Sequence, residues 1–381
     1  MASSGNNRGI LPDPQELEVS IFGPGFGECV VLHLGEGHWG VIDSCLDPNS
    51  RRPAALDYLE SLGVDVGSSI RFIVATHWHD DHMEGIGEAF HQSKSAVFAC
   101  TEAIRQPDFQ EVLGAWTGIR FLAGGSGIDE LRSVLAELQK RKPDMRYPSP
   151  RLASVNKVLW ERLDEPSANV KALSPSDAAV MAAIAQVQKT TPKASRARRR
   201  IPNIEPNDAS VVISVRVGHH QVLLGADLQV RKDRGIGWLA IVDGIEAGAA
   251  LHQVFKVAHH GSPNADHDEV WQKMLAAQPC AATTPFVRGN VRLPSVGDCL
   301  RILDRTPNAY LTAPAQPGKF SDPSRTVEKT VMETTLSAHF FPGKYGQVRL
   351  RKRIAQPADS AWQVDLFGNA LSVEDYVLAA H

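Results

Sequence analysis

The sequence predicts an α/β fold, and three observations lead to this prediction. Short apolar runs rich in β-branched residues recur along the chain, bounded by glycine or histidine, as buried strands are. Segments with the apolar spacing of helices alternate with these runs. The 381 residues, 43% hydrophobic and 22% charged, can bury a sizeable core. This length suits either one elaborated α/β unit or about two to three domains.

The N-terminal part predicts mainly strands. Residues 16–22 alternate between apolar and polar side chains, which is the period of a half-buried strand. Glycine-rich turns at 23–28 and 35–40 then separate two further strands of a hairpin or meander. A short helix follows between Pro53 and Gly63, before a buried strand at 70–75.

The remaining elements follow in the same order. We expect residues 101–172 to be mainly a helical insertion, because Ser126 and Asp129 resemble a capping box before an apolar stripe. Later strands are expected at 211–217, 221–225, 254–258, 281–284 and 309–312, with helices at 268–277 and 295–304. We expect residues 1–320 to form one domain, and residues 321–381 to form a C-terminal extension with a β-hairpin packed on it.

Charge and cysteine usage exclude several classes of protein. The formal net charge is −3, so no global positive field would hold a polyanion. The five cysteines are scattered and contain no CxxC pair, which argues against a disulfide framework or a cysteine zinc ribbon. The N-terminus lacks an apolar segment, and no run could span a bilayer. We therefore expect a cytoplasmic protein without membrane contact.

One strongly basic segment stands out at residues 189–200. Its arginines are Arg196, Arg198, Arg199 and Arg200, and it contains no acid. Such a run is either a solvated flexible loop or an arm that gives the protein a local grip on the phosphates of nucleic acid. Protein partners cannot be read from the sequence.

The strongest chemical signal is HWHDDH, which directly follows the strand at 70–75. It contributes His77, His79, Asp81 and His82 within six residues. Such a cluster would be an unpaired polar burden at a strand end, so metal binding explains it best. His77 and His79 lie two residues apart and can share one ion, while Asp81 and His82 turn toward a second position. Imidazole and carboxylate ligands suit Zn²⁺, Mn²⁺ or Fe.

This string resembles the HxHxDH signature of the metallo-β-lactamase superfamily. Two later segments resemble its further motifs: LLGAD, which ends at Asp227, and FKVAHHGS, which contains His259 and His260. The resemblance implies an αββα sandwich, with two mixed sheets face to face and helices outside. It also implies that the Asp227 carboxylate bridges two metals and that His260 binds the second.

Within the superfamily, the HHGS ending resembles the metallo-β-lactamase domain of the competence DNA-uptake protein and phosphorylcholine esterases. The matching opening places Asp43 at a strand end, and NDASVVI places Asn207, Asp208 and Ser210 near the site. By this resemblance His259 would contact a phosphate or act as general acid.

The sequence departs from the superfamily in one ligand. Dinuclear members have a third histidine on the first metal, but the interval before Asp227 offers only His91, His219 and His220. His91 follows the motif too closely, and the other two lie in a turn. We therefore expect the first site to hold His77, His79 and Asp227, with Asp208 or water completing it, and one or two ions in total.

These ligands predict a hydrolase. A cation held by imidazoles and carboxylates lowers the pKa of a bound water to about 7 and so supplies hydroxide. Asp81 would orient that water, and His259 would donate a proton to the leaving oxygen. Lys256, Arg288 and Arg292, which flank the last motif, are candidates for binding a substrate phosphate together with Asn207.

Three functions are compatible with these residues. The first is a phosphodiesterase, most specifically a nuclease on DNA or RNA. The second is a small-molecule hydrolase acting on a phosphoester, lactone, thioester or β-lactam. The third is a non-catalytic metal-binding component of a larger assembly.

Overall fold

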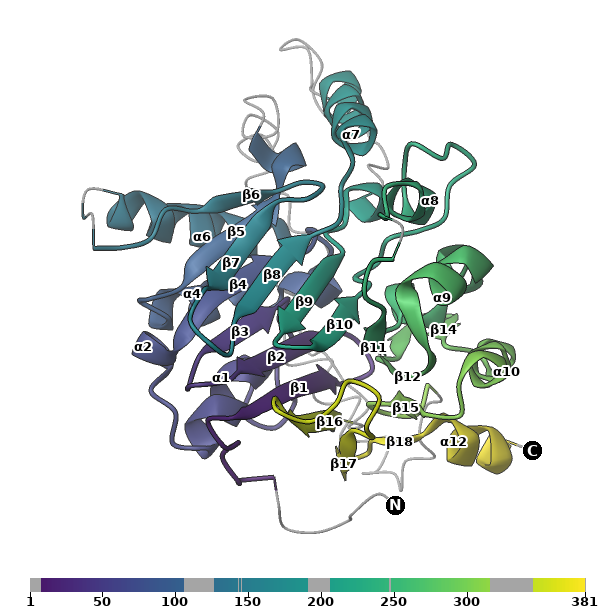
Figure 1. Ribbon diagram of the computed structural model, residues 1–381. Helices are drawn as coiled ribbons and strands as arrows, with labels where there is room; N and C mark the ends of the chain where they lie inside the picture. Colours follow the sequence, from purple (N-terminus) through teal and green to yellow (C-terminus); the bar gives the residue numbers. More distant parts are fainter. Residues whose placement is uncertain are drawn as a thin grey trace, which may run out of the picture.

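Two eight-stranded mixed sheets lie face to face, with helices on both outer faces (Figure 1). The computed structural model describes residues 8–105, 127–142, 144, 146–190, 206–246, 248–315 and 345–380. The architecture is the αββα sandwich of the metallo-β-lactamase fold, so the predicted fold class is confirmed. The basic residues Arg196, Arg198, Arg199 and Arg200 lie outside the described residues.

The first sheet is antiparallel in one half and parallel in the other. In spatial order it contains β17 (Gln363–Gly368), β16 (Gly346–Arg353), β1 (Glu16–Gly23), β2 (Cys29–Leu34), β3 (Trp39–Ile42), β4 (Ile70–Ala75), β5 (Val97–Thr101) and β6 (Arg151–Ala153). Neighbours from β17 to β3 are antiparallel, and neighbours from β3 to β6 are parallel.

The second sheet combines parallel and antiparallel pairs in a similar way. In spatial order it contains β18 (Leu371–Ser372), β15 (Ala309–Leu311), β12 (Leu275–Thr283), β11 (His252–Lys256), β10 (His220–Leu224), β9 (Ile213–Val217), β8 (Ala168–Ala172) and β7 (Val158–Arg162). The strands from β15 to β10 are parallel, and the pairs at both ends are antiparallel. A separate hairpin joins β13 (Phe286–Arg288) to β14 (Val291–Leu293).

Alternating side chains divide the interior into three apolar layers. Phe72 of β4 and Val222 of β10 belong to one buried cluster, which receives residues from both sheets and fills the space between them. Their neighbours Ile73 and Leu223 point the other way, into the clusters under the helices. Both faces of each sheet are therefore buried, so polar side chains that remain accessible lie mainly at the ends of the strands.

Helices cover both outer faces. The first sheet is covered by α1 (Ala54–Ser61), α4 (Ile86–Gln92) and α6 (Gly127–Arg141), and the second by α8 (Trp238–Asp243), α9 (Asp268–Met274), α10 (Val296–Arg305) and α12 (Val373–Ala380). The short helices α2 (Val66–Ser69) and α3 (Asp80–Met83) flank β4, and α7 (Asp177–Thr190) follows β8. Among the described residues, no helix is long and apolar enough to cross a membrane.

Two segments differ from the sequence prediction. The described residues between 101 and 172 are not mainly helical: α6 is present, but residues 151–172 contribute β6, β7 and β8. These strands are three to five residues long, too short for their alternation to outweigh the helical signal beside them. The C-terminal hairpin of β16 and β17 does not only pack on the domain, because β16 pairs with β1 along eight residues of the first sheet.

A buried histidine in β2 makes folding sensitive to acid. His33 is 2% exposed; its Nδ1 lies 2.8 Å from the carbonyl of Glu16, and its Nε2 accepts the amide proton of Gly37 at 3.2 Å. This arrangement satisfies a neutral ring whose Nδ1 carries the proton. Burial lowers the pKa of His33 to about 4.

We expect the free energy of unfolding to fall by about 3 kcal/mol more in the wild type than in His33→Gln as the pH decreases from about 6.5 to 4. The unfolded chain binds the proton first, so this stability is present above about pH 6.5 and is lost as the pH falls. Urea unfolding at several pH values measures it. Equal pH dependence of the two proteins would refute the assignment.

Candidate metal centre

The predicted ligand residues meet at one edge of the sandwich. His77, His79 and His82 follow β4 of the first sheet, Asp227 follows β10, and His260 follows β11 of the second. All three strands belong to the parallel parts of their sheets, and the carboxyl ends of such strands form the crevice where open α/β sheets bind ligands. Packing the two sheets brings the three segments together.

Local backbone geometry turns these side chains inward. α3 begins directly after His79, so Asp81 and His82 fold back toward β4 and are 5% and 0% exposed. His259 and His260 have φ values of 49° and 53°, and both lie in the left-handed region. Two successive non-glycine residues in this region are strained, and such strain is concentrated at functional sites.

The described residues form two groups of possible ligands, and Asp227 belongs to both. One group is His77, His79 and Asp227; the other is Glu28, His82, Asp227 and His260, and the ligand atoms within each lie within 4.8 Å of one another. The family resemblance implies that Asp227 is shared between two metal sites, and its membership of both ligand groups agrees with that expectation.

Within the second group, the ring atoms decide which carboxylate can bind an ion. Nδ1 of His82 already lies 2.7 Å from Asp43 Oδ2, and Nδ1 of His260 lies 3.1 Å from the carbonyl of Thr284. Glu28 approaches only these Nδ1 atoms, at 3.7 and 3.8 Å. An ion must therefore bind the Nε2 atoms, which lie on the other side of the rings from Glu28.

Asp81 and Asp227 face those Nε2 atoms. Nε2 of His260 lies 3.2 Å from Asp81 Oδ2 and 3.7 Å from Asp227 Oδ2. Nε2 of His82 lies 3.7 Å from Asp81 Oδ2 and 3.4 Å from Asp227 Oδ1. Ligand bonds of about 2.1 Å in a tetrahedron place neighbouring ligand atoms about 3.4 Å apart. Each of the two imidazole nitrogens therefore lies from both carboxylates at about the separation expected of neighbouring ligands on one zinc ion.

Two buried atoms of this group lack a hydrogen-bond partner. His82 Nε2 and Asp227 Oδ1 face each other, and neither forms a hydrogen bond with the described residues. Although burial opposes charge, the carboxylates of Asp227 and Glu28 raise the pKa of His82 well above its ordinary value. An excess of buried negative charge surrounds the ring. A divalent cation would satisfy both atoms and balance that charge.

The first group offers three ligand atoms. His77 Nε2 lies 3.1 Å from His79 Nδ1 and 3.9 Å from Asp227 Oδ2. Asp208 belongs to neither group of possible ligands among the described residues, and its carboxylate pairs with Arg231 at 2.5 Å.

The three candidate histidines between the motif and Asp227 also lie elsewhere. His91 contacts Glu137, His219 is exposed, and His220 contacts two backbone carbonyls. None of these three histidines belongs to either group of possible ligands.

His259 faces the site without joining either group. Its Nδ1 lies 2.9 Å from Asn264 Oδ1, which leaves Nε2 directed toward Asp227 Oδ2 at 3.9 Å. Asn207 Nδ2 lies 3.5 Å from the same Nε2, and Asn207 Oδ1 is buried without a hydrogen-bond partner among the described residues. Burial lowers the pKa of His259, so the neutral ring is favoured in the ion-free protein.

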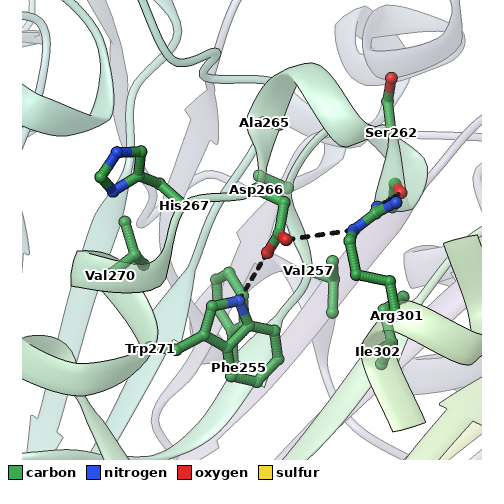
Figure 2. A pocket seen from close by; sticks show the side chains of 12 residues that line it. Phe255, Val257, Ser262, Ala265, Asp266, His267, Val270, Trp271, Arg301 and Ile302 are labelled. Carbon is green, nitrogen blue, oxygen red and sulfur yellow. Dashed lines mark hydrogen bonds and ion pairs between the residues drawn. The ribbon is translucent and has the colours of Figure 1, made fainter. Parts of the chain in front are cut away.

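Arg301 of α10 contacts the turn that carries His259 and His260, and Figure 2 shows its ion pair with Asp266 just after that turn. Arg301 donates to the carbonyl of Gly261 at 2.6 Å and forms an ion pair with Asp266 at 3.1 Å. The indole nitrogen of Trp271 donates to the same Asp266 carboxylate at 2.6 Å. These contacts fix the end of the strained turn.

A pocket of about 260 Å³ opens over the ligands. Arg288, Asn207 and His259 line it, whereas Arg292 does not. The apolar part of its wall consists of Trp78, Phe286, Val291 and Leu293. The hairpin β13–β14 thus supplies one wall, with Arg288 exposed beside the ring of Phe26, 5.4 Å from its centroid.

The predicted role of Lys256 in substrate binding is contradicted. Its side chain is 1% exposed, lies outside the pocket, and forms an ion pair of 2.5 Å with Glu28 Oε2. Lys256 is the last residue of β11, and its side chain points into the interior toward Glu28 instead of toward the pocket. Glu28 was not predicted from the sequence; its only signal is an acid at the end of the glycine turn GPGFGE.

Comparisons with known proteins find similar folds. No family model and no curated protein sequence matches the chain. The metallo-β-lactamase fold protein YhfI from Bacillus subtilis is 12% identical, with a TM-score of 0.29, over 57% of this chain and 64% of YhfI. The chain thus spans less than two thirds of that protein.

Two further solved structures match in the same way. The short form of human tRNase Z is 13% identical, with a TM-score of 0.29, over 57% of this chain and 72% of its own. A diphosphatase from the PhnP family is 9% identical, with a TM-score of 0.33, over 75% of this chain and 72% of its own. These are similarities of fold, so the chemistry proposed below rests on the side chains of this chain.

We expect Asp43→Asn to weaken cation binding by about 10- to 100-fold. Asp43 accepts the backbone and hydroxyl protons of Thr76 and faces Nδ1 of His82, each at 2.7 Å. An amide in this position would favour the wrong tautomer of His82, with a proton on Nε2. Competition with a chromophoric chelator measures the affinity. Asp243→Asn, which removes an exposed carboxylate, is the control, and equal affinities of the two variants would contradict the prediction.

Proposed function

We propose that the chain is a metal-dependent hydrolase of phosphodiesters and that its substrate is DNA or RNA. The observation that carries the proposal is the pair of ligand groups that share Asp227 at the base of a pocket containing Arg288. Zn²⁺ suits the distances from the imidazoles of His82 and His260 to the carboxylates of Asp81 and Asp227, and Mn²⁺ suits the same ligand types. The HHGS ending, which resembles phosphodiester-cleaving relatives, adds support.

The side chains divide the work of hydrolysis. When bound, a divalent cation here would supply hydroxide at neutral pH and offset charge on the phosphate oxygens. Asp81 lies where it can both hold the ion and orient the attacking water. Arg288 can bind a non-bridging phosphate oxygen. Asn264 Oδ1 can accept the proton on Nδ1 of His259, and the charged form of the ring can donate its second proton from Nε2 to the departing oxygen.

The size of the pocket favours one alternative. A volume of about 260 Å³ lies near the lower limit for ligand sites. It suits a small phosphoester or the end of a nucleic-acid strand better than an intact duplex. A small-molecule hydrolase is therefore the second candidate. The basic segment at 189–200 would favour nucleic acid, and its contribution remains a prediction from the sequence.

We expect purified protein with Zn²⁺, Mn²⁺ or Mg²⁺ to cleave fluorescent single-stranded or double-stranded DNA or RNA, and Asp227→Ala to abolish cleavage. Gel analysis with each cation measures the activity. Turnover of a small phosphodiester alone would establish the second candidate. Bound metal without turnover of any ester would support a non-catalytic component and refute the hydrolase.

We expect His259→Asn to reduce kcat on an alkyl phosphodiester by about 100-fold or more, because the leaving alkoxide needs a proton. A nitrophenolate leaving group departs without protonation, so the kcat of the variant on a nitrophenyl phosphodiester should change little. Asparagine tolerates the left-handed backbone at this position. His219→Asn, at an exposed turn, is the control. An equal loss on both substrates would exclude the role of proton donor.

We expect Arg288→Gln to raise KM about 10-fold with little change in kcat, because a charge-assisted hydrogen bond to the substrate is lost. Arg292→Gln is the matched control, since Arg292 lies on the same hairpin but outside the pocket. Steady-state kinetics on one phosphodiester compare the two. Equal KM values would remove Arg288 from the substrate site.

A further inference from the structure

We propose that the buried Glu28–Lys256 ion pair positions the imidazoles of His82 and His260, and that it sets the affinity of the cation site that these imidazoles form with Asp81 and Asp227. The pair joins the two sheets: Glu28 lies directly before β2 of the first sheet, and Lys256 ends β11 of the second. The inference rests on the metal centre proposed above and is independent of the substrate.

The Glu28 carboxylate lies behind both imidazoles of the second group. Its oxygens are 3.7 Å from Nδ1 of His82 and 3.8 Å from Nδ1 of His260. Thr284 Oγ1 donates to the carboxylate at 2.7 Å and lies 3.1 Å from Nδ1 of His260. Glu28 thus lies beside the Nδ1 edges of His82, which follows the first sheet, and of His260, which follows the second. The Nε2 atoms of both rings point away from it.

The backbone of Glu28 is fixed to the same centre. Its amide donates to the carbonyl of Asp81 at 2.9 Å, so a backbone hydrogen bond joins the loop before β2 to the loop after β4. The preceding Gly27 has a φ of 112°, and a Cβ there would lie 2.8 Å from Cys45 Cβ. Glycine is therefore required for the chain to approach this closely, and Glu28 is held from both sides.

Lys256 explains why Glu28 can lie here without acting as a ligand. An unpaired carboxylate close to two metal-binding imidazoles would compete with Asp81 and Asp227 for the ion. The Lys256 ammonium, 2.5 Å from Glu28 Oε2, neutralises it and holds it behind the rings. A buried ion pair adds little net stability compared with apolar side chains of the same size, so its presence fits a role in orienting the rings.

The test is a double-mutant cycle of Glu28→Gln, Lys256→Met and the combined variant. Each single change leaves one buried charge unpaired and is expected to lower the urea midpoint. The combined variant contains no unpaired charge and should recover most of that stability. Its Zn²⁺ affinity, measured by chelator competition, should nevertheless remain about 10- to 100-fold below the wild type. Cobalt substitution should show altered visible bands, because the imidazole geometry has changed.

A second buried pair provides the matched control. Arg349 and Asp365 form an ion pair of 2.9 Å between β16 and β17, and both side chains are 1% exposed. Arg349→Met combined with Asp365→Asn should change the urea midpoint and leave Zn²⁺ affinity and the cobalt spectrum unchanged.

The outcomes separate the two proposals. If the Glu28→Gln/Lys256→Met variant folds and binds Zn²⁺ as tightly as the wild type, the pair is structural only and the inference is overturned. If the wild type itself binds no Zn²⁺, Mn²⁺ or Co²⁺, the metal centre fails and the pair loses its proposed role with it.

Discussion

The Asp227 carboxylate is the group on which the rest of the site depends. It contacts His77 and His82 from the first sheet and His260 from the second. No strand carries enough ligands alone, so the site exists only where the two sheets pack face to face. The apolar layer between the sheets therefore assembles the site as well as stabilising the fold.

A layer of hydrogen bonds fixes the imidazoles before any ion arrives. The ring nitrogens that point away from the ligand positions have partners: Thr76 for His77, Asp43 for His82, and Thr284 for His260. Such partners select the tautomer that leaves the other nitrogen free to bind a cation. The orientation of the three imidazoles thus depends on hydrogen bonds from residues outside both ligand groups.

The sequence predicted the parts of the site that lie in continuous strings. HWHDDH, LLGAD and FKVAHHGS each follow a strand, and parallel strands end at one edge, so their convergence could be expected. The sequence did not show toward which sheet or surface each side chain points. Lys256 was therefore expected in the pocket although it lies behind the metal centre, and Glu28 was missed. The strands β6, β7 and β8 escaped notice because three to five residues carry too little periodicity.

The pairing of β1 with β16 has a consequence for how the chain folds during synthesis. Glu16 is paired with Arg353, so the edge of β1 is completed only after residues 346–353 have left the ribosome. Until then β1 exposes a row of unpaired backbone groups, which can pair with other chains. Contacts this distant in sequence also slow folding. The late arrival of β16 therefore makes the nascent protein most vulnerable to aggregation at its N-terminal strand.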